Sequence, residues 1–119
     1  MMNAWFRLAS FLMLAGVVLG AFGAHGLKSR LSPDSLDIYH TAVLYHFIHA
    51  GALFAVSWVS SQNPSGRAAL AGYAFTLGIL LFSGSLYALA VTGQKWLGAV
   101  TPLGGIAFIV GWAVLALGV

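Results

Sequence analysis

The sequence has 119 residues, of which 61% are hydrophobic and only 6% are charged. A water-soluble domain carries about a quarter charged residues, so this chain lacks the polar surface that would cover a globule in water. The net charge of +3 comes from dispersed Lys and Arg side chains, without the basic cluster of a nucleic-acid-binding protein. The absence of cysteine excludes disulfides, thiolate metal sites and thiol catalysis. The composition therefore predicts an integral membrane protein with a single domain over residues 1–119.

The first apolar run, residues 4–24, is long enough to cross a hydrocarbon layer about 30 Å thick as a helix. Gly16 and Gly20 form a Gly-x-x-x-Gly pair within it. Small residues at this spacing allow two membrane helices to approach closely. The pair therefore predicts a packing face, which could serve a neighbouring helix of the same chain or a second copy of the protein.

A polar connection follows the first run and ends in a signal for the start of a helix. Ser32 precedes Pro33, which is the order of an N-cap and a first helical residue. Asp34 and Asp37 fall in the first turn, where the helix dipole favours acids. Because these are the only two acidic residues of the chain, no carboxylate is expected inside the membrane.

The second predicted span, residues 36–59, contains three of the four histidines. His46 and His49 lie about 15 and 19 Å along it, near the middle of the hydrocarbon layer, whereas His40 lies near the surface. An ionisable group at this depth is costly to place in lipid and normally marks a functional site. Helical periodicity predicts one buried face, which consists of Tyr39, Ala42, His46, His49, Ala50, Leu53 and Ser57.

The third predicted span, residues 68–91, carries a second stripe of small and polar residues. By residue count, Ser83 lies about 12 Å from one end of this span, which is about the level of His46 on the second span. The two side chains are therefore expected to meet. We predict a polar layer whose histidines bond across helices to hydroxyl or backbone groups, and we take a small hydrophobic ligand in this layer as a further hypothesis. Its members are Tyr39, His46, His49, Ser83 and Tyr87.

The fourth predicted span, residues 97–118, begins either at Leu97 or at Pro102 with Thr101 as its N-cap. Gly104 and Gly111 predict a further packing stripe. Together the four runs predict an all-α polytopic membrane protein, with four transmembrane helices in an up-down bundle.

The basic residues give a direction for the chain in the membrane. Three of them lie on the side of the first and third connections, and two lie on the other side: Lys28, Arg30 and Lys95 against Arg7 and Arg67. This difference of one charge favours the cytoplasm for the first side, with both termini outside.

Other functions would use the same residues. Histidine is the commonest metal ligand, so a metal or haem site is an alternative, with His25, His40, His46 and His49 as candidate ligands. A small proton-linked transporter is a third hypothesis, although the small multidrug exporters, which also have four spans, exchange protons at a membrane-embedded acid. An enzyme is not predicted, because a pair of Ser83 and His46 would lack an acid to orient the imidazole. The sequence does not identify a cofactor.

Four motifs follow one another in an order that resembles a known family. They are Gly20-Ala-Phe-Gly-Ala-His-Gly-Leu27, Tyr45-His-Phe-Ile-His-Ala50, Phe82-Ser-Gly-Ser-Leu-Tyr87 and Thr101-Pro-Leu-Gly-Gly-Ile-Ala-Phe108 with Gly111-Trp112. With them the whole chain resembles the YgdD-like family of small bacterial inner-membrane proteins, a domain of unknown function. The resemblance implies a four-helix protein of the bacterial cytoplasmic membrane, with no established activity. We therefore expect a non-enzymatic packing or partner protein in the lipid bilayer, either as a homo-oligomer or with another membrane protein.

Overall fold

The computed structural model describes residues 4–64 and 66–118, and within these ranges all regular structure is helical. Its elements are α1 (Ala4–Phe22), the π-helical turn η1 (Gly23–Leu27), α2 (Pro33–Gln62), α3 (Ala68–Gly78), the π-helical turn η2 (Ile79–Ser83), α4 (Gly84–Thr92), the 3₁₀ turn η3 (Lys95–Ala99) and α5 (Thr101–Leu117). They join into four helices that are long and apolar enough to cross a membrane: Ala4–Leu27, Pro33–Gln62, Ala68–Thr92 and Lys95–Leu117. The prediction of an all-α protein with four spans is confirmed.

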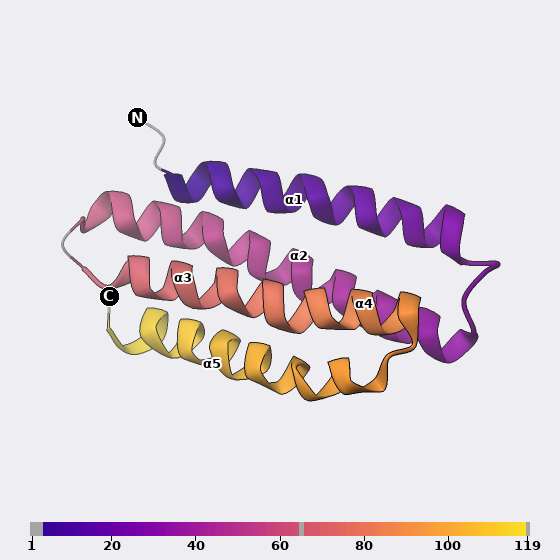
Figure 1. Ribbon diagram of the computed structural model, residues 1–119. Coiled ribbons are helices and arrows are strands. Elements are labelled where there is room, and N and C mark those ends of the chain that lie inside the picture. Colours follow the sequence, from indigo (N-terminus) through magenta and orange to yellow (C-terminus); the bar gives the residue numbers. More distant parts are fainter. Residues whose placement is uncertain (1–3, 65, 119) are drawn as a thin grey trace.

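The four long helices lie side by side in a shallow row (Figure 1). α1 packs on α2, α2 packs on the helix formed by α3, η2 and α4, and that helix packs on α5. The molecule measures 48 × 28 × 16 Å, so it is wide and flat rather than square in cross-section. Along the helix axes, α1 begins and α5 ends at the same end of the bundle (Figure 1). We call the opposite end of the bundle, which holds η1 and η3, the loop-one end.

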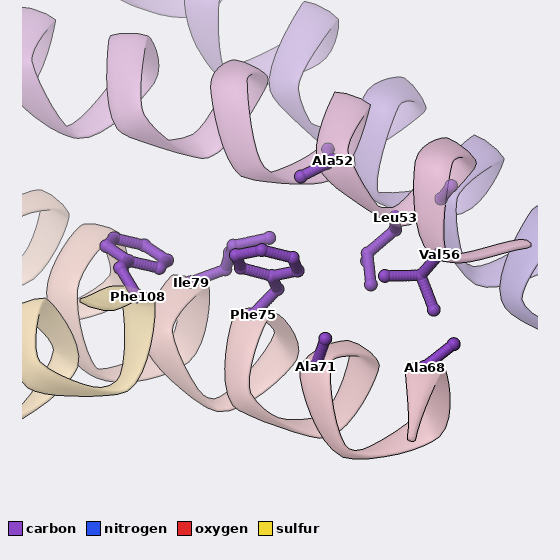
Figure 2. Packing of buried hydrophobic residues seen from close by; sticks show 10 residues of the cluster. Ala52, Leu53, Val56, Ala68, Ala71, Phe75, Ile79 and Phe108 are labelled. Atoms are coloured by element: carbon purple, nitrogen blue, oxygen red, sulfur yellow. The ribbon is translucent and has the colours of Figure 1, made fainter. Parts of the chain in front are cut away.

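Tight packing is concentrated between α2 and α3. Figure 2 shows Leu53 and Val56 of α2 above Ala71 and Phe75 of α3, and all four are buried. The alanines leave room for the larger side chains, and such small residues let membrane helices come close together. The outward surfaces instead carry large apolar side chains, among them Phe11, Leu14, Val17, Leu80, Ile106 and Ile109. This distribution, with small residues between helices and large apolar residues outside, is the one that a lipid environment favours.

The predicted start of the second helix is confirmed. Ser32 is the N-cap, and its side-chain oxygen accepts a hydrogen bond from the backbone N–H of Ser35 at 3.1 Å. Pro33 is the first helical residue. α2 therefore extends beyond the predicted span of residues 36–59 at both ends. At its start, the polar first turn continues the helix out of the hydrocarbon layer.

The predicted N-cap of the fourth helix is wrong by one residue. Val100 occupies the N-cap position of α5, and Thr101 is already helical. The hydroxyl of Thr101 lies 2.6 Å from the hydroxyl of Ser85 on α4. It therefore joins two helices instead of capping one, and the 3₁₀ turn η3 fills the stretch between the two starts that the sequence allowed.

Candidate functional site

The predicted buried face of α2 is confirmed. Tyr39, His46 and His49 expose 3% of their surface or less, whereas Leu44 and Ile48 expose 56% and 46%. The two deep histidines nevertheless point to different neighbours. His46 contacts α1 and α4, and His49 contacts α5. The predicted polar layer is therefore divided into two separate groups.

His46 is held by two hydrogen bonds that use both of its ring nitrogens. Its Nε2 lies 2.7 Å from the carbonyl oxygen of Leu12, and its Nδ1 lies 2.8 Å from the hydroxyl of Tyr87. A carbonyl oxygen only accepts hydrogen bonds, so Nε2 carries the hydrogen, and Nδ1 of the neutral ring accepts from Tyr87. His46 thus joins α1, α2 and α4 across the row.

Two further polar contacts complete this first group. The hydroxyl of Tyr39 donates to the carbonyl oxygen of Leu19 at 2.5 Å, and its ring packs edge-on against Tyr87 at 5.2 Å between centroids. Ser83 is fully buried and donates to the carbonyl oxygen of Ala42 at 2.8 Å. Ala42 lies one turn of α2 before His46, and no hydrogen bond joins Ser83 to His46 among the described residues. We call Tyr39, His46, Ser83 and Tyr87 the inner cluster.

His49 belongs to the second group, between α2 and α5. Its Nδ1 donates to the carbonyl oxygen of Tyr45 at 2.8 Å, and its Nε2 accepts from the indole N–H of Trp112 at 3.0 Å. Because an indole N–H only donates, Nε2 is unprotonated and the ring is neutral. The imidazole also stacks on Phe108, with 3.5 Å between centroids and an interplanar angle of 7°.

An open groove lies beside His49, on the surface that faces the lipid. Its volume is about 480 Å³, and it is lined by Leu44, Tyr45, Ile48, His49, Phe82, Gly105, Phe108, Ile109 and Trp112. We call it the lateral groove. Tyr45 packs against Phe82 at 4.5 Å between ring centroids. Its hydroxyl forms no hydrogen bond with the residues that the structure describes.

The sequence did not single out Tyr45 and Trp112 as site residues. Tyr45 lies outside the buried stripe of α2, and Trp112 lies on a helix whose rotation the sequence left undetermined. Both nevertheless belong to the ordered motifs. That position was the only signal that could have found them.

The candidate metal ligands do not come together. His25 and His40 are exposed, and their neighbours do not complete a metal site. Within residues 4–64 and 66–118, no group of three or more His, Cys, Asp or Glu side chains could hold a metal ion. His46 and His49 use both ring nitrogens within the chain, so neither offers a free lone pair.

The predicted packing glycines face other helices of the same chain. A Cβ atom added to Gly16 would lie 2.9 Å from the ring of Phe47, and one added to Gly20 would lie 3.6 Å from Val43, both on α2. Gly104 and Gly111 of α5 face the third long helix, and their neighbours there are Phe82 and Phe75. These close approaches require the absence of a side chain at Gly16, Gly104 and Gly111.

The chain is similar along almost its whole length to bacterial proteins described as membrane proteins. It is 44% identical over 115 residues to UPF0382 membrane protein YwdK of Bacillus subtilis, which covers 96% of this chain and 94% of that protein. It is 40% identical over 116 residues to a UPF0382 membrane protein of Staphylococcus epidermidis, covering 98% and 94% of the two chains. A UPF0382 membrane protein of Haemophilus influenzae is 39% identical over 118 residues, covering 99% and 94%.

No solved structure matches the chain. A family model described as "Protein of unknown function (DUF423)" matches residues 19–105. The matched part contains α2, both π-helical turns and the start of α5, and with them the inner cluster and Tyr45. The chain is an integral, multi-pass membrane protein that belongs to the DUF423 family.

Proposed function

We propose that this protein is a non-enzymatic binding protein that holds a small hydrophobic ligand in the lateral groove. The observation that carries the proposal is the hydroxyl of Tyr45. It lies about 18 Å along α2, inside the hydrocarbon layer, without a hydrogen-bond partner among the described residues. An unpaired polar group in lipid costs several kcal/mol. A ligand with a hydrogen-bond acceptor would remove this cost.

The walls of the groove indicate what such a ligand looks like. Aromatic rings from three long helices border it, including Tyr45, Phe82 and Trp112. Aromatic side chains prefer offset or edge-on contacts with other rings. A flat, unsaturated ring that carries a carbonyl oxygen, as in a quinone, therefore matches both the walls and the Tyr45 hydroxyl. The opening between Leu44, Ile48 and Ile109 would admit it from the lipid, because these side chains are exposed.

The inner cluster, unlike the lateral groove, has the features of a structural contact between helices. Tyr39, His46, Ser83 and Tyr87 satisfy one another or nearby carbonyl groups, and no buried side-chain N or O atom of the described residues lacks a partner. A ligand could enter only by breaking these bonds. We therefore assign the inner cluster to helix packing, so that His49 is the one member of the predicted layer that also borders the groove.

The absence of an enzymatic name among the relatives, and of a catalytic acid beside His46 and Ser83, supports a non-enzymatic role. The bacterial sources of the relatives support a location in the cytoplasmic membrane, with the lipid bilayer as the main partner. The resemblance to the YgdD-like family agrees with this location. A homo-oligomer would use the outer face of α1, of which little is buried within the chain.

The test uses the fluorescence of Trp112 and an alkylated 1,4-naphthoquinone as the probe. A variant with Trp5, Trp58 and Trp96 replaced by Phe retains Trp112 as its one indole. In detergent, the quinone should quench Trp112 saturably. Gly105→Leu, which fills the groove, should abolish the saturable part. Tyr45→Phe should weaken binding about fivefold, the value of one hydrogen bond.

Tyr73→Phe is the matched control, because Tyr73 is an exposed tyrosine on α3 that does not line the groove. It should leave the quenching curve unchanged. Linear quenching without saturation, or equal saturable quenching in the Gly105→Leu variant, would overturn the proposal.

A further inference from the structure

A second, smaller cavity lies at the loop-one end, where the first long helix ends and α2 begins. Its volume is about 210 Å³, and it is lined by Gly23, Ala24, Lys28, Leu36 and His40. Two of these residues, Lys28 and His40, carry polar groups and are exposed. The cavity is distinct from the lateral groove, with which it shares no lining residue.

Both polar groups lie at the level of the lipid headgroups. Lys28 directly follows Leu27, the last residue of the first membrane-spanning helix. His40 lies about 10 Å along α2 from Pro33, and side chains on a helix tilt toward its N-terminus. The aliphatic stem of a lysine at this position can lie along apolar surface while its ammonium group reaches the interface. The cavity therefore opens where a bilayer presents its phosphates.

The donors in the cavity suit an anion. The ammonium group of Lys28 offers three N–H donors and no acceptor, and the imidazole of His40 offers an N–H in either protonation state. The only two acids of the chain, Asp34 and Asp37, do not line the cavity. Anionic lipids attract Lys and Arg near the membrane surface, with about 1 kcal/mol for each residue.

The surface below the cavity is shaped for an acyl chain. Leu44 and Ile48 follow His40 at steps of four residues, so they lie below it on the same side of α2. They expose 56% and 46% of their surface. An anion bound between Lys28 and His40 would thus have an apolar track directly beneath it. A polar site above an apolar surface fits a lipid better than a free phosphate ion, because the ion has no apolar part to contact Leu44 and Ile48.

We propose that the cavity between η1 and α2 is a site for the phosphate of an anionic membrane lipid, bound by Lys28 and His40, with one acyl chain along Leu44 and Ile48. Leu44 and Ile48 also line the lateral groove, but Lys28 and His40 lie outside it, so binding of the phosphate does not require a ligand in that groove. It gives the protein a selective lipid partner at the loop-one side of the membrane.

The experiment compares phosphatidylglycerol and phosphatidylcholine of the same acyl chains by native mass spectrometry of the full chain in detergent. The protein should retain one phosphatidylglycerol, at least about fivefold in preference to phosphatidylcholine. Lys28→Gln and His40→Gln should each lower the retained phosphatidylglycerol severalfold. Lys95→Gln is the matched control, since it removes one positive charge from the same side of the membrane without touching the cavity. It should retain the lipid.

Several results would overturn the proposal. Equal retention of both lipids would remove the anion selectivity, and an equal loss in the Lys95→Gln variant would show a general effect of charge. Full retention by the Lys28→Gln/His40→Gln double variant would exclude the site itself. Displacement of the lipid by inorganic phosphate at equal concentration would assign the site to a free anion. Because both side chains are exposed, circular dichroism should show unchanged helix content in each variant.

Discussion

Gly104 of α5 rests directly on the backbone of Phe82 in η2. A Cβ atom added to Gly104 would lie 2.7 Å from the Cα atom of Phe82, and one added to Gly78 would lie 3.1 Å from the carbonyl oxygen of Gly104. Real Cβ atoms essentially never come within 3.0 Å of such neighbours. At this point two membrane helices touch backbone to backbone, and the π-helical turn forms one side of the contact.

We therefore expect Gly104→Ala to destabilise the protein strongly. The added methyl group meets main-chain atoms, which cannot move aside as a flexible side chain can, and overpacking of this kind costs about 1–3 kcal/mol. Thermal unfolding in detergent, followed by circular dichroism, should show a clearly lower melting temperature. Gly105→Ala is the matched control, because its Cβ would lie 3.9 Å from the ring of Phe82. A Gly104→Ala variant as stable as Gly105→Ala would show that the contact is looser than described.

The sequence predicted those parts of the fold that depend on local patterns. The N-cap at Ser32 follows from the residues next to it, and the buried face of α2 follows from the helical period. Tyr39, His46 and His49 are buried because the polar and small residues of α2 repeat at the spacing of one helix face. Four spans follow from the length and hydropathy of the apolar runs.

The partners of these residues could not be predicted in the same way. His46 bonds to Leu12 and Tyr87 because α1 and α4 lie on that side of α2, and His49 bonds to Trp112 because α5 lies on another side. The order of helices in the row and the rotation of each helix decide both contacts. A period within one helix holds no such information, so a single polar layer was expected where two groups exist.

The lateral groove escaped prediction for a related reason. It is lined by residues of α2, α5 and Phe82, and Phe82 lies in the π-helical turn η2. A π-helical turn depends on the packing around it, and it is often found near functional sites. Residue types alone did not indicate it.

Tyr87→Phe should lower the stability of the protein by about 1 kcal/mol, the size of a hydrogen bond inside a membrane protein. The variant retains the ring that packs on Tyr39, but it removes the O–H that donates to Nδ1 of His46. Thermal or denaturant-induced unfolding in detergent would measure the loss. Tyr45→Phe removes a hydroxyl without a partner among the described residues, so it should not lower stability. Equal effects of the two substitutions would contradict the distinction between the inner cluster and the lateral groove.

Gly23→Ala should disturb the packing of α1 on α2. An added Cβ would lie 2.9 Å from the Cδ1 atom of Tyr39, and this ring is held in place by the bond to Leu19 and the contact with Tyr87. We expect a loss of about 1–2 kcal/mol, because the buried ring must shift. Near-ultraviolet circular dichroism should report the change in the tyrosine environment. Gly20→Ala, with its nearest neighbour Val43 at 3.6 Å, should be tolerated.

The purified protein should contain no stoichiometric metal or haem, and a chelator should not change its melting temperature. Metal binding requires an imidazole lone pair, but Nδ1 of His46 accepts from Tyr87 and Nε2 of His49 accepts from Trp112. A metal ion at either ring would first have to break a hydrogen bond inside the membrane. Elemental analysis and an absorption spectrum would measure the content. A Soret band, or one equivalent of metal that disappears in the His46→Ala variant, would show instead that the inner cluster opens to bind a cofactor. In that case the Tyr87→Phe variant should still bind the metal, because this substitution frees the lone pair on Nδ1 of His46.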